Sequence, residues 1–327
     1  MRKTICSWAN LFFNPLKLTV QKMKDADALE KYSEALEKLY LSRLEQQSSP
    51  FGQPVDCIIF SKDRALQLHA LLSSYQERVS SSGSVHVLYW ASKSMHQEAY
   101  DEVTALFKNY PVFFTKQNSV ESFQKDLVAI LLSLHSSKVF FLVDDILFLE
   151  KVDLKQFSGF DTNSFIPSLR MGMNLQRCYT LQQEQVLPEW TADVLDTNEL
   201  LVWEWCNGEL DWAYPLSVDG HLFSTREMQI IAQSVSFSAP NTFEDAIQVF
   251  RPIFSPRYGV CYAKSRIVNI PCNKVQVENK NISGFVDQDF LAEQWLKGKQ
   301  MNYRRLYGYA NRSAHEEILF DLIPREN

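Results

Sequence analysis

The sequence has no paired-cysteine motif, no glycine-rich loop and no long apolar run. Its six cysteines stand far apart, which excludes the usual zinc-ligand and redox spacings. Its ten glycines form no Walker pattern or other phosphate loop, which counts against kinases and dehydrogenases. No apolar stretch reaches the ~18 residues that a transmembrane helix needs. These absences favour a soluble protein with reduced thiols, which predicts a cytoplasmic location.

The composition is that of an ordinary globular protein. Of 327 residues, 46% are hydrophobic and 22% are charged. A chain of this length can bury a large core without disulfide bonds. The formal net charge of −6 argues against a broad nucleic-acid-binding surface. An anionic substrate would have to be held locally, by a few basic groups or by a metal ion.

The N-terminal region differs from the rest of the chain. Residues 5–13 are partly apolar but short and interrupted by Asn10, so they resemble neither a signal peptide nor a membrane span. They are either a weak peripheral membrane contact or a segment that packs on the protein. Apolar residues at helical spacing predict a helix over 25–46, and Ser, Pro and Gly then predict a linker up to Pro54.

From Val55 onward, short apolar strands alternate with amphipathic helices. This alternation predicts a mainly parallel sheet with helices on both faces. Ligands of such sheets bind at the carboxyl ends of the strands, so the loops at 61–64, 116–119 and 143–146 are expected to form the site. The expected strands are 56–60, 85–90, 111–115 and 139–142, and the expected helices are 64–75, 95–109 and 119–135.

The strongest chemical feature is the pair Asp144-Asp145 at the end of the apolar strand 139–142. Buried carboxylates without a counter-charge are costly. A divalent cation with a preference for oxygen ligands, Mg²⁺ or Mn²⁺, would resolve the conflict. The alternative is that the pair caps the following turn or pairs with a Lys or Arg.

A second polar group, Ser61-Lys62-Asp63-Arg64, follows the first strand at the same sheet edge. A carboxylate there can bind a base or ribose, and a cation can bind phosphate. Asp63 also suits a helix N-cap. After the third strand, Asn118 can cap the next helix or face the ligand, and Lys125 lies further along that helix.

The second half of the chain carries aromatic and acidic residues close together. Residues 203–215 contain Trp205 and Trp212 among carboxylates, a composition that suits sugar rings but also a buried aromatic core patch. Asp219 and His221 flank a glycine and are expected in a cleft.

The motifs together resemble GT-A-type glycosyltransferases of the family 2 kind, over residues 55–320. The resemblance rests on a strand followed by Ser61-Lys62-Asp63-Arg64, on Val143-Asp144-Asp145, on Ser168-Leu169-Arg170, and on an acidic pair in 240–246. It implies an α/β GT-A fold, Rossmann-like, with a mainly parallel central sheet and an N-terminal helical extension. Residues 1–52 would be the extension and linker, 53–150 the nucleotide-binding half, and 151–327 the acceptor-binding half.

The resemblance also implies partners and roles. The partners are a nucleotide-sugar donor and a saccharide or other hydroxyl acceptor, and the cofactor is Mn²⁺ or Mg²⁺. The catalytic base is expected at Glu244 or Asp245, with Asp219 in reserve. The donor is expected to contact Ser61, Lys62, Asp63, Arg64, Asn118, Lys125 and Asp144. The metal is expected at Asp144, Asp145 and His315, and the acceptor at Trp205, Trp212 and His221.

Two other functions remain open. A sugar nucleotidyltransferase has a similar sheet and metal, but it normally carries a glycine-rich signature that Phe60–Ala65 lacks. A GT-A-like fold without catalysis would be a binding module. Val143 keeps this second alternative open, because many members of the family have Asp there. Fold alone does not fix function.

Overall fold

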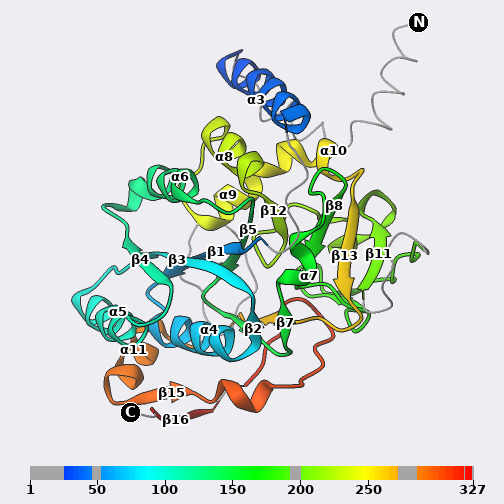
Figure 1. Cartoon of the computed structure of the whole chain (residues 1–327). Helices are drawn as coiled ribbons and strands as arrows, with labels where there is room; N and C mark the ends of the chain where they lie inside the picture. Colours follow the sequence, from blue (N-terminus) through cyan, green and yellow to red (C-terminus); the bar gives the residue numbers. More distant parts are fainter. Residues whose placement is uncertain (1–25, 46–52, 192–199, 272–285, 320, 326–327) are drawn as a thin grey trace, which may run out of the picture.

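A computed structural model describes residues 26–45, 53–191, 200–271, 286–319 and 321–325 (Figure 1). It is a mixed α/β structure in which a central, mostly parallel sheet is flanked by helices, as expected from the sequence. The predicted strands are confirmed as β1 (Val55–Lys62), β3 (Ser82–Trp90), β4 (Val112–Lys116) and β5 (Lys138–Val143). The predicted helices are confirmed as α4 (Ala65–Arg78), α5 (Ser94–Leu106) and α6 (Phe123–Ser133), the last preceded by a 3₁₀ turn over Val120–Ser122.

The central sheet has the strand order β12-β5-β1-β3-β4. Strands β5, β1, β3 and β4 are parallel, and β12 (Leu222–Ser224) pairs antiparallel with β5. The chain steps from β1 outward to β3 and β4, and then returns to place β5 on the other side of β1. This reversal opens a crevice between the carboxyl ends of β1 and β5, which is where open α/β sheets bind their ligands.

The apolar strands are buried on both faces. In β1, Cys57 and Ile59 belong to one core cluster, and Ile58 and Phe60 belong to the other, because neighbouring side chains of a strand point to opposite faces. Helices α4, α5 and α11 (Gln288–Leu296) cover the first face. Helices α6, α8 (Thr225–Ser234) and α9 (Pro240–Ile247) cover the second (Figure 1).

A smaller three-stranded sheet extends the second half of the chain. Its order is β11-β13-β8, formed by Leu200–Glu204, Tyr258–Tyr262 and Phe165–Ser168. Gly259 lets the Trp203 ring lie directly against its backbone, since an added Cβ would stand 2.3 Å from that ring.

The remaining short elements are β2 (Val79–Ser80), β6 (Ile146–Phe148), β7 (Val152–Asp153), α7 (Lys155–Ser158), β9 (Arg177–Cys178), β10 (Gln183–Glu184), α10 (Arg251–Phe254), β14 (Ile267–Asn269), β15 (Lys299–Met301) and β16 (Leu322–Pro324).

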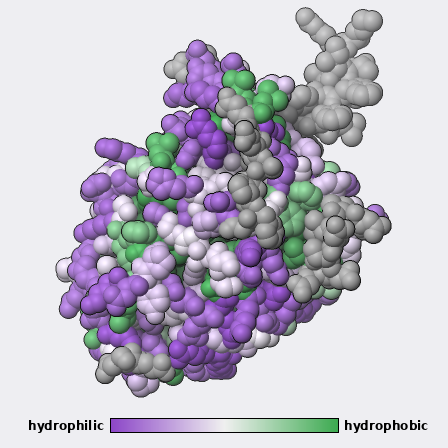
Figure 2. All heavy atoms as spheres, viewed as in Figure 1, coloured by the Kyte–Doolittle hydropathy of each residue, from purple (hydrophilic) through white to green (hydrophobic). Residues whose placement is uncertain are grey.

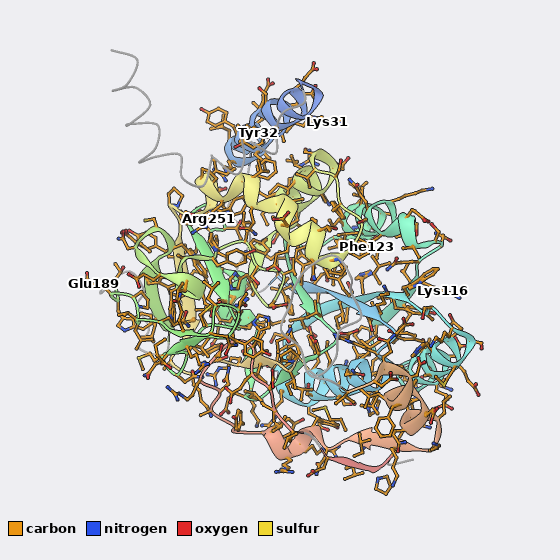
Figure 3. The ribbon with its side chains drawn as sticks, turned by 180° about the vertical axis from the view of Figure 1, so that it is seen from behind. Lys31, Tyr32, Lys116, Phe123, Glu189 and Arg251 are labelled. Carbon is orange, nitrogen blue, oxygen red and sulfur yellow. The ribbon has the colours of Figure 1, made fainter. Side chains whose placement is uncertain are left out.

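The predicted N-terminal helix is present as α3 (Ala26–Glu45) and packs on α8. Ala35 and Leu39 are buried in the core of the second sheet face, and Arg43 donates to the buried Glu227 on α8. The view from behind in Figure 3 shows α3, with Tyr32, near the segment that carries Arg251. Residues 5–13, for which the sequence left a membrane contact open, and most of the predicted linker lie outside the described residues.

The surface and the thiols agree with the composition. On the face shown in Figure 2, hydrophilic residues dominate and hydrophobic residues form small separate patches. The described cysteines are free thiols: Cys57, Cys178 and Cys261 are buried, and Cys206 is exposed. Within the described ranges, no helix is long and apolar enough to cross a membrane.

Candidate active site

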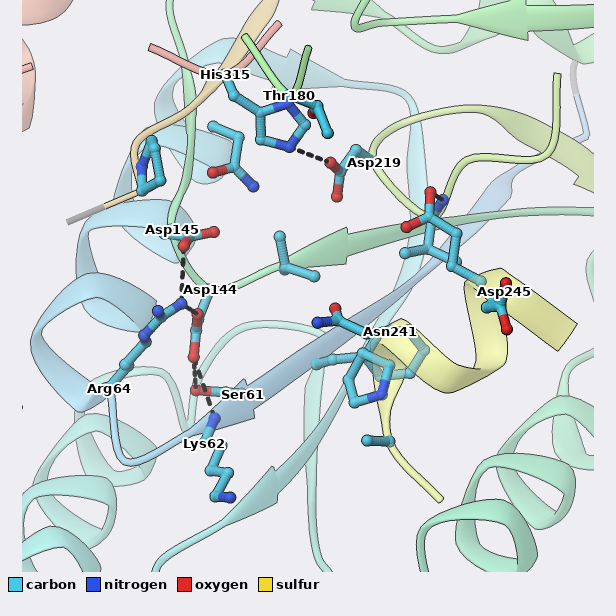
Figure 4. A pocket seen from close by; sticks show the side chains of 18 of the residues that line it. Ser61, Lys62, Arg64, Asp144, Asp145, Thr180, Asp219, Asn241, Asp245 and His315 are labelled. Atoms are coloured by element: carbon cyan, nitrogen blue, oxygen red, sulfur yellow. Dashed lines mark hydrogen bonds and ion pairs between the residues drawn. The ribbon is translucent and has the colours of Figure 1, made fainter. Parts of the chain in front are cut away.

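A cavity of about 610 Å³ lies at the carboxyl ends of β1, β3 and β5. Its walls come from the loops after these strands and from segments of the second half of the chain, including the start of α9 (Figure 4). The charged side chains that line it are Lys62, Arg64, Asp144, Asp145, Arg170, Asp211, Asp219, Glu244, Asp245 and His315. The six carboxylates outnumber the basic groups, so the cavity favours a ligand that brings positive charge with it.

Asp144 joins the ends of β1 and β5. Its Oδ2 accepts a hydrogen bond from Ser61 Oγ at 2.8 Å and from the Lys62 backbone N–H at 3.1 Å, and its Oδ1 accepts from Arg64 Nη1 at 2.9 Å. The backbone N–H of Asp144 donates to the Phe60 carbonyl at 3.1 Å. Both carboxylate oxygens are therefore engaged by the chain itself, which fixes Asp144 as the joint between the two strands.

Arg64 also reaches Asp145. The same Nη1 lies 2.7 Å from Asp145 Oδ2, so one guanidinium nitrogen bridges the two carboxylates. Arg64 stands at the start of α4, where its backbone N–H donates to the Tyr100 hydroxyl at 3.1 Å. The sequence left open whether the Asp144-Asp145 pair contacts a Lys or Arg, and in this structure both aspartates contact Arg64.

Burial raises the pKa of both aspartates. Desolvation raises the pKa of Asp144, against the opposing charge of Arg64. Desolvation raises the pKa of Asp145 to about 6, again opposed by Arg64 and reinforced by the charges of Asp144 and Asp219. Positive charge brought to Asp145 would therefore be stabilised.

Asp219 and His315 form a second polar pair in the cavity wall. His315 Nε2 lies 3.2 Å from Asp219 Oδ2, and Figure 4 shows this contact together with Asp145 in the cavity wall. Burial alone would raise the pKa of Asp219, but its hydrogen bond and charge interaction with His315, together with Arg170, lower it. Asp219 is thus held as a carboxylate.

Arg170 is a pocket residue that was seen in the sequence only as part of Ser168-Leu169-Arg170. It is buried, and it donates to Asp211 at 2.7 Å and to Ser217 Oγ at 2.9 Å. Its Nη1 lies 3.7 Å from Asp219. An arginine directly after a strand was a usable signal, but its target carboxylates stand about forty residues later in the chain.

Glu244 and Asp245 project from α9 at the edge of the cavity. Glu244 is half-buried, accepts from the Val218 backbone N–H at 3.3 Å, and lies close to Asp219. Desolvation and the charge of Asp219 raise its pKa to about 7, against the charge of Arg170. Asp245, one position on, lines the cavity but is exposed. The two side chains thus differ in environment as neighbours on a helix must.

Three of the expected donor residues lie elsewhere. Asp63 is buried with its backbone in the left-handed region, φ 56°, and its Oδ1 accepts from the Ser92 N–H at 2.7 Å. It therefore ties the loop after β1 to the loop after β3. Asn118 and Lys125 are exposed and do not line the cavity, and Asn118 bonds to Asp126. Gln117, the residue before Asn118, lines the cavity instead.

The expected acceptor residues are core residues in this structure. Trp205 and Trp212 are 0% exposed and pack around Trp203. His221 is 1% exposed, and burial followed by the charge of Arg170 lowers its pKa to about 3. None of the three lines the cavity. The two tryptophans therefore belong to a buried aromatic core patch, which was the alternative that the sequence left open. Tyr214, in the same stretch, does line the cavity.

The donor atoms around Asp145 suit a hard divalent cation. In the described part of the chain, no three His, Cys, Asp or Glu side chains form a ready-made metal cage. Mg²⁺ commonly needs no such cage, because one or two carboxylates and the substrate phosphates hold it. Asp145 fits this pattern better than Asp144. Both oxygens of Asp144 accept hydrogen bonds, from Ser61, Lys62 and Arg64, whereas Arg64 contacts Asp145 through Oδ2.

The comparisons with known proteins give a distant structural similarity. The chain aligns with the crystal structure of S. aureus TarS 1–349, a glycosyltransferase, with 14% sequence identity and a TM-score of 0.42. The alignment covers 65% of this chain and 59% of that one. No protein family and no curated protein matches the sequence. Similarity at this level does not establish a family or an activity for the chain.

Proposed function

We propose that the protein is a GT-A-type glycosyltransferase that binds a nucleotide-diphospho-sugar, with Mn²⁺ or Mg²⁺, and transfers the sugar to a hydroxyl acceptor. The observation that supports this proposal most is the cavity at the strand-order reversal. It combines a buried Asp144–Asp145 pair and basic groups on one side with Glu244, whose pKa is about 7, on the other.

The donor side is the part formed by the ends of β1, β3 and β5. Trp90 and Gln117 offer a ring face and an amide to a nucleoside, and Lys62 and Arg64 offer positive charge to the diphosphate. A cation held by Asp145, with Asp144 and His315 nearby, would neutralise further charge on the phosphates. Basic groups placed where negative charge develops stabilise the departing nucleoside diphosphate.

The acceptor side includes Glu244 and Tyr214. In an inverting transfer, the bond between the anomeric carbon and the phosphate oxygen breaks, and the nucleoside diphosphate leaves with the electron pair. The acceptor oxygen forms the new bond to that carbon and gives its proton to the Glu244 carboxylate. A carboxyl group with a pKa of about 7 is well matched to this role near neutral pH. Asp245 and Asp219 are the other two carboxylates of the cavity that the sequence offers as the base.

A product assay tests the proposal. Purified protein is incubated with Mn²⁺, UDP- or GDP-sugars and a panel of saccharide acceptors, and the released nucleotides are separated. Acceptor-dependent release of nucleoside diphosphate supports glycosyl transfer. A parallel reaction contains pyrophosphate in place of the acceptor, and formation of nucleoside triphosphate and sugar phosphate there would identify a nucleotidyltransferase instead. Binding of donor without any turnover would identify a binding module.

A further inference from the structure

Arg64 occupies the position at which a cation would meet both carboxylates of the Asp144–Asp145 pair. Its Nη1 lies 2.9 Å from Asp144 Oδ1 and 2.7 Å from Asp145 Oδ2. All three side chains are buried or nearly so, with 10%, 4% and 8% of their side-chain surfaces exposed. The chain therefore contains its own counter-charge for the pair.

We infer that Arg64 and a divalent cation compete for Asp145, and that the diphosphate of the nucleotide draws Arg64 away, so that metal and nucleotide bind together rather than one by one. This inference rests on the proposed function for the identity of the ligand. It assigns Arg64 a regulatory role in addition to its contact with phosphate.

The competition between Arg64 and a cation follows from the hydrogen bond that Arg64 makes to Asp145. A hydrogen bond between ionised groups stabilises a protein enough that a ligand which must break it, with no new bond in return, binds ~10-fold or more weakly. The bond between Arg64 and Asp145 Oδ2 is short and buried. A cation that binds Asp145 in the free protein must either displace this bond or lie beside the positive charge of Arg64, and both weaken its binding.

A diphosphate changes this balance because it supplies new acceptors for the guanidinium. Arginine binds phosphate oxygens in a two-pronged geometry at least as well as it binds carboxylates. Arg64 is the residue before α4, its backbone N–H donates to the Tyr100 hydroxyl, and its side chain lines the cavity in which the diphosphate would lie. Each ligand then favours the other, and this coupling is reciprocal.

The test is the affinity for Mn²⁺ alone, measured from the paramagnetic resonance signal of free Mn²⁺ at pH 8 without any nucleotide. We expect weak binding by the wild-type protein and at least ~10-fold tighter binding by Arg64→Gln. Arg64→Lys keeps a cation and should stay close to wild type. The double variant Arg64→Gln/Asp145→Asn should lose the gain.

A matched control removes an arginine of equal charge far from the cavity. Arg304 pairs with Glu77 on α4, so Arg304→Gln should leave Mn²⁺ affinity unchanged. If Arg64→Gln does not fold, as judged by its melting transition, Arg64→Met takes its place. A folded Arg64→Gln or Arg64→Met variant that binds Mn²⁺ no more tightly than wild type overturns the inference.

This result is independent of the proposed function. Wild-type protein that releases nucleoside diphosphate, with no gain of Mn²⁺ affinity in Arg64→Gln, would leave glycosyl transfer standing and remove the competition. A gain of Mn²⁺ affinity in Arg64→Gln, in a protein that neither binds nor turns over nucleotide-sugars, would support the competition for Asp145 and remove the proposed glycosyl transfer.

Discussion

Replacing Glu244 with Gln tests the assignment of the base. Burial and the nearby Asp219 raise the pKa of Glu244 to about 7, and the charge of Arg170 limits that rise. Gln keeps the size and the hydrogen bond from the Val218 N–H but cannot accept the acceptor proton. Loss of a general base is expected to lower turnover ~10²-fold or more, with donor affinity nearly unchanged.

The pH profile gives the same prediction a sharper form. A base works only when it is deprotonated, so wild-type turnover should rise with pH through the pKa of Glu244. With a pKa of about 7, roughly a tenth of the molecules carry the ionised base at pH 6, about half at pH 7 and about nine tenths at pH 8. The rise in turnover between pH 6 and pH 8 should therefore be ~10-fold, and the Glu244→Gln variant should lack it.

The assay is steady-state release of nucleoside diphosphate from pH 5.5 to 8.5, with donor affinity measured separately by calorimetry. Asp245→Asn is the matched control, because it removes a carboxylate from the adjacent, exposed position on α9. If Glu244→Gln keeps full turnover, and its turnover rises with pH as that of wild type does, Glu244 is not the base. Loss of turnover in Asp245→Asn but not in Glu244→Gln would move the role to Asp245.

The remaining predictions concern the metal, the core and the N-terminal helix. Asp145→Ala should remove most of the Mn²⁺-dependent gain in UDP or GDP affinity and leave the melting temperature near that of wild type, as calorimetry can show. Gly259→Ala should destabilise the fold by ~1–3 kcal/mol in urea unfolding, because the new Cβ would stand 2.3 Å from the Trp203 ring. A chain that begins at Gln53 should still bind donor nucleotide but melt at a lower temperature, since it loses the core contacts of α3 and its bond to Glu227. Insolubility of that shortened chain would show that α3 is required for folding.

The sheet was predictable from the sequence because its strands are apolar on both faces. Buried strands such as β1 and β5 need no polar alternation, so short apolar runs between helices identified them. The meeting of Ser61 with Asp144 followed from the same reasoning, since both follow parallel strands at one edge. Strand β12 was not predictable, because it pairs with β5 from about eighty residues further along the chain and is three residues long.

The composition of the second half was less informative about position. Trp205 and Trp212 stand among acids, a pattern shared by sugar-binding surfaces and by aromatic cores. The pattern does not reveal that each ring turns toward Trp203 and away from the cavity. Arg170 escaped assignment for the opposite reason, since its partner Asp211 is distant in sequence and near in space.

The position of Arg64 required the structure as well. A sequence that reads Ser61-Lys62-Asp63-Arg64 places two cations and a carboxylate in one loop, but it does not say which of them faces the crevice. The left-handed backbone of Asp63 turns its carboxylate toward Ser92, and the Arg64 guanidinium then reaches the aspartate pair.

Titration calorimetry of the wild-type protein with UDP and with GDP, each with and without Mn²⁺, tests the central claim most directly. We predict saturable binding of at least one of these nucleotides, at least ~10-fold tighter with Mn²⁺ than without, because the cation would neutralise the phosphate charges beside Asp145. No binding of either nucleotide in the presence of Mn²⁺, by a protein with a normal melting transition, would contradict the assignment of this cavity to a nucleotide-diphospho-sugar.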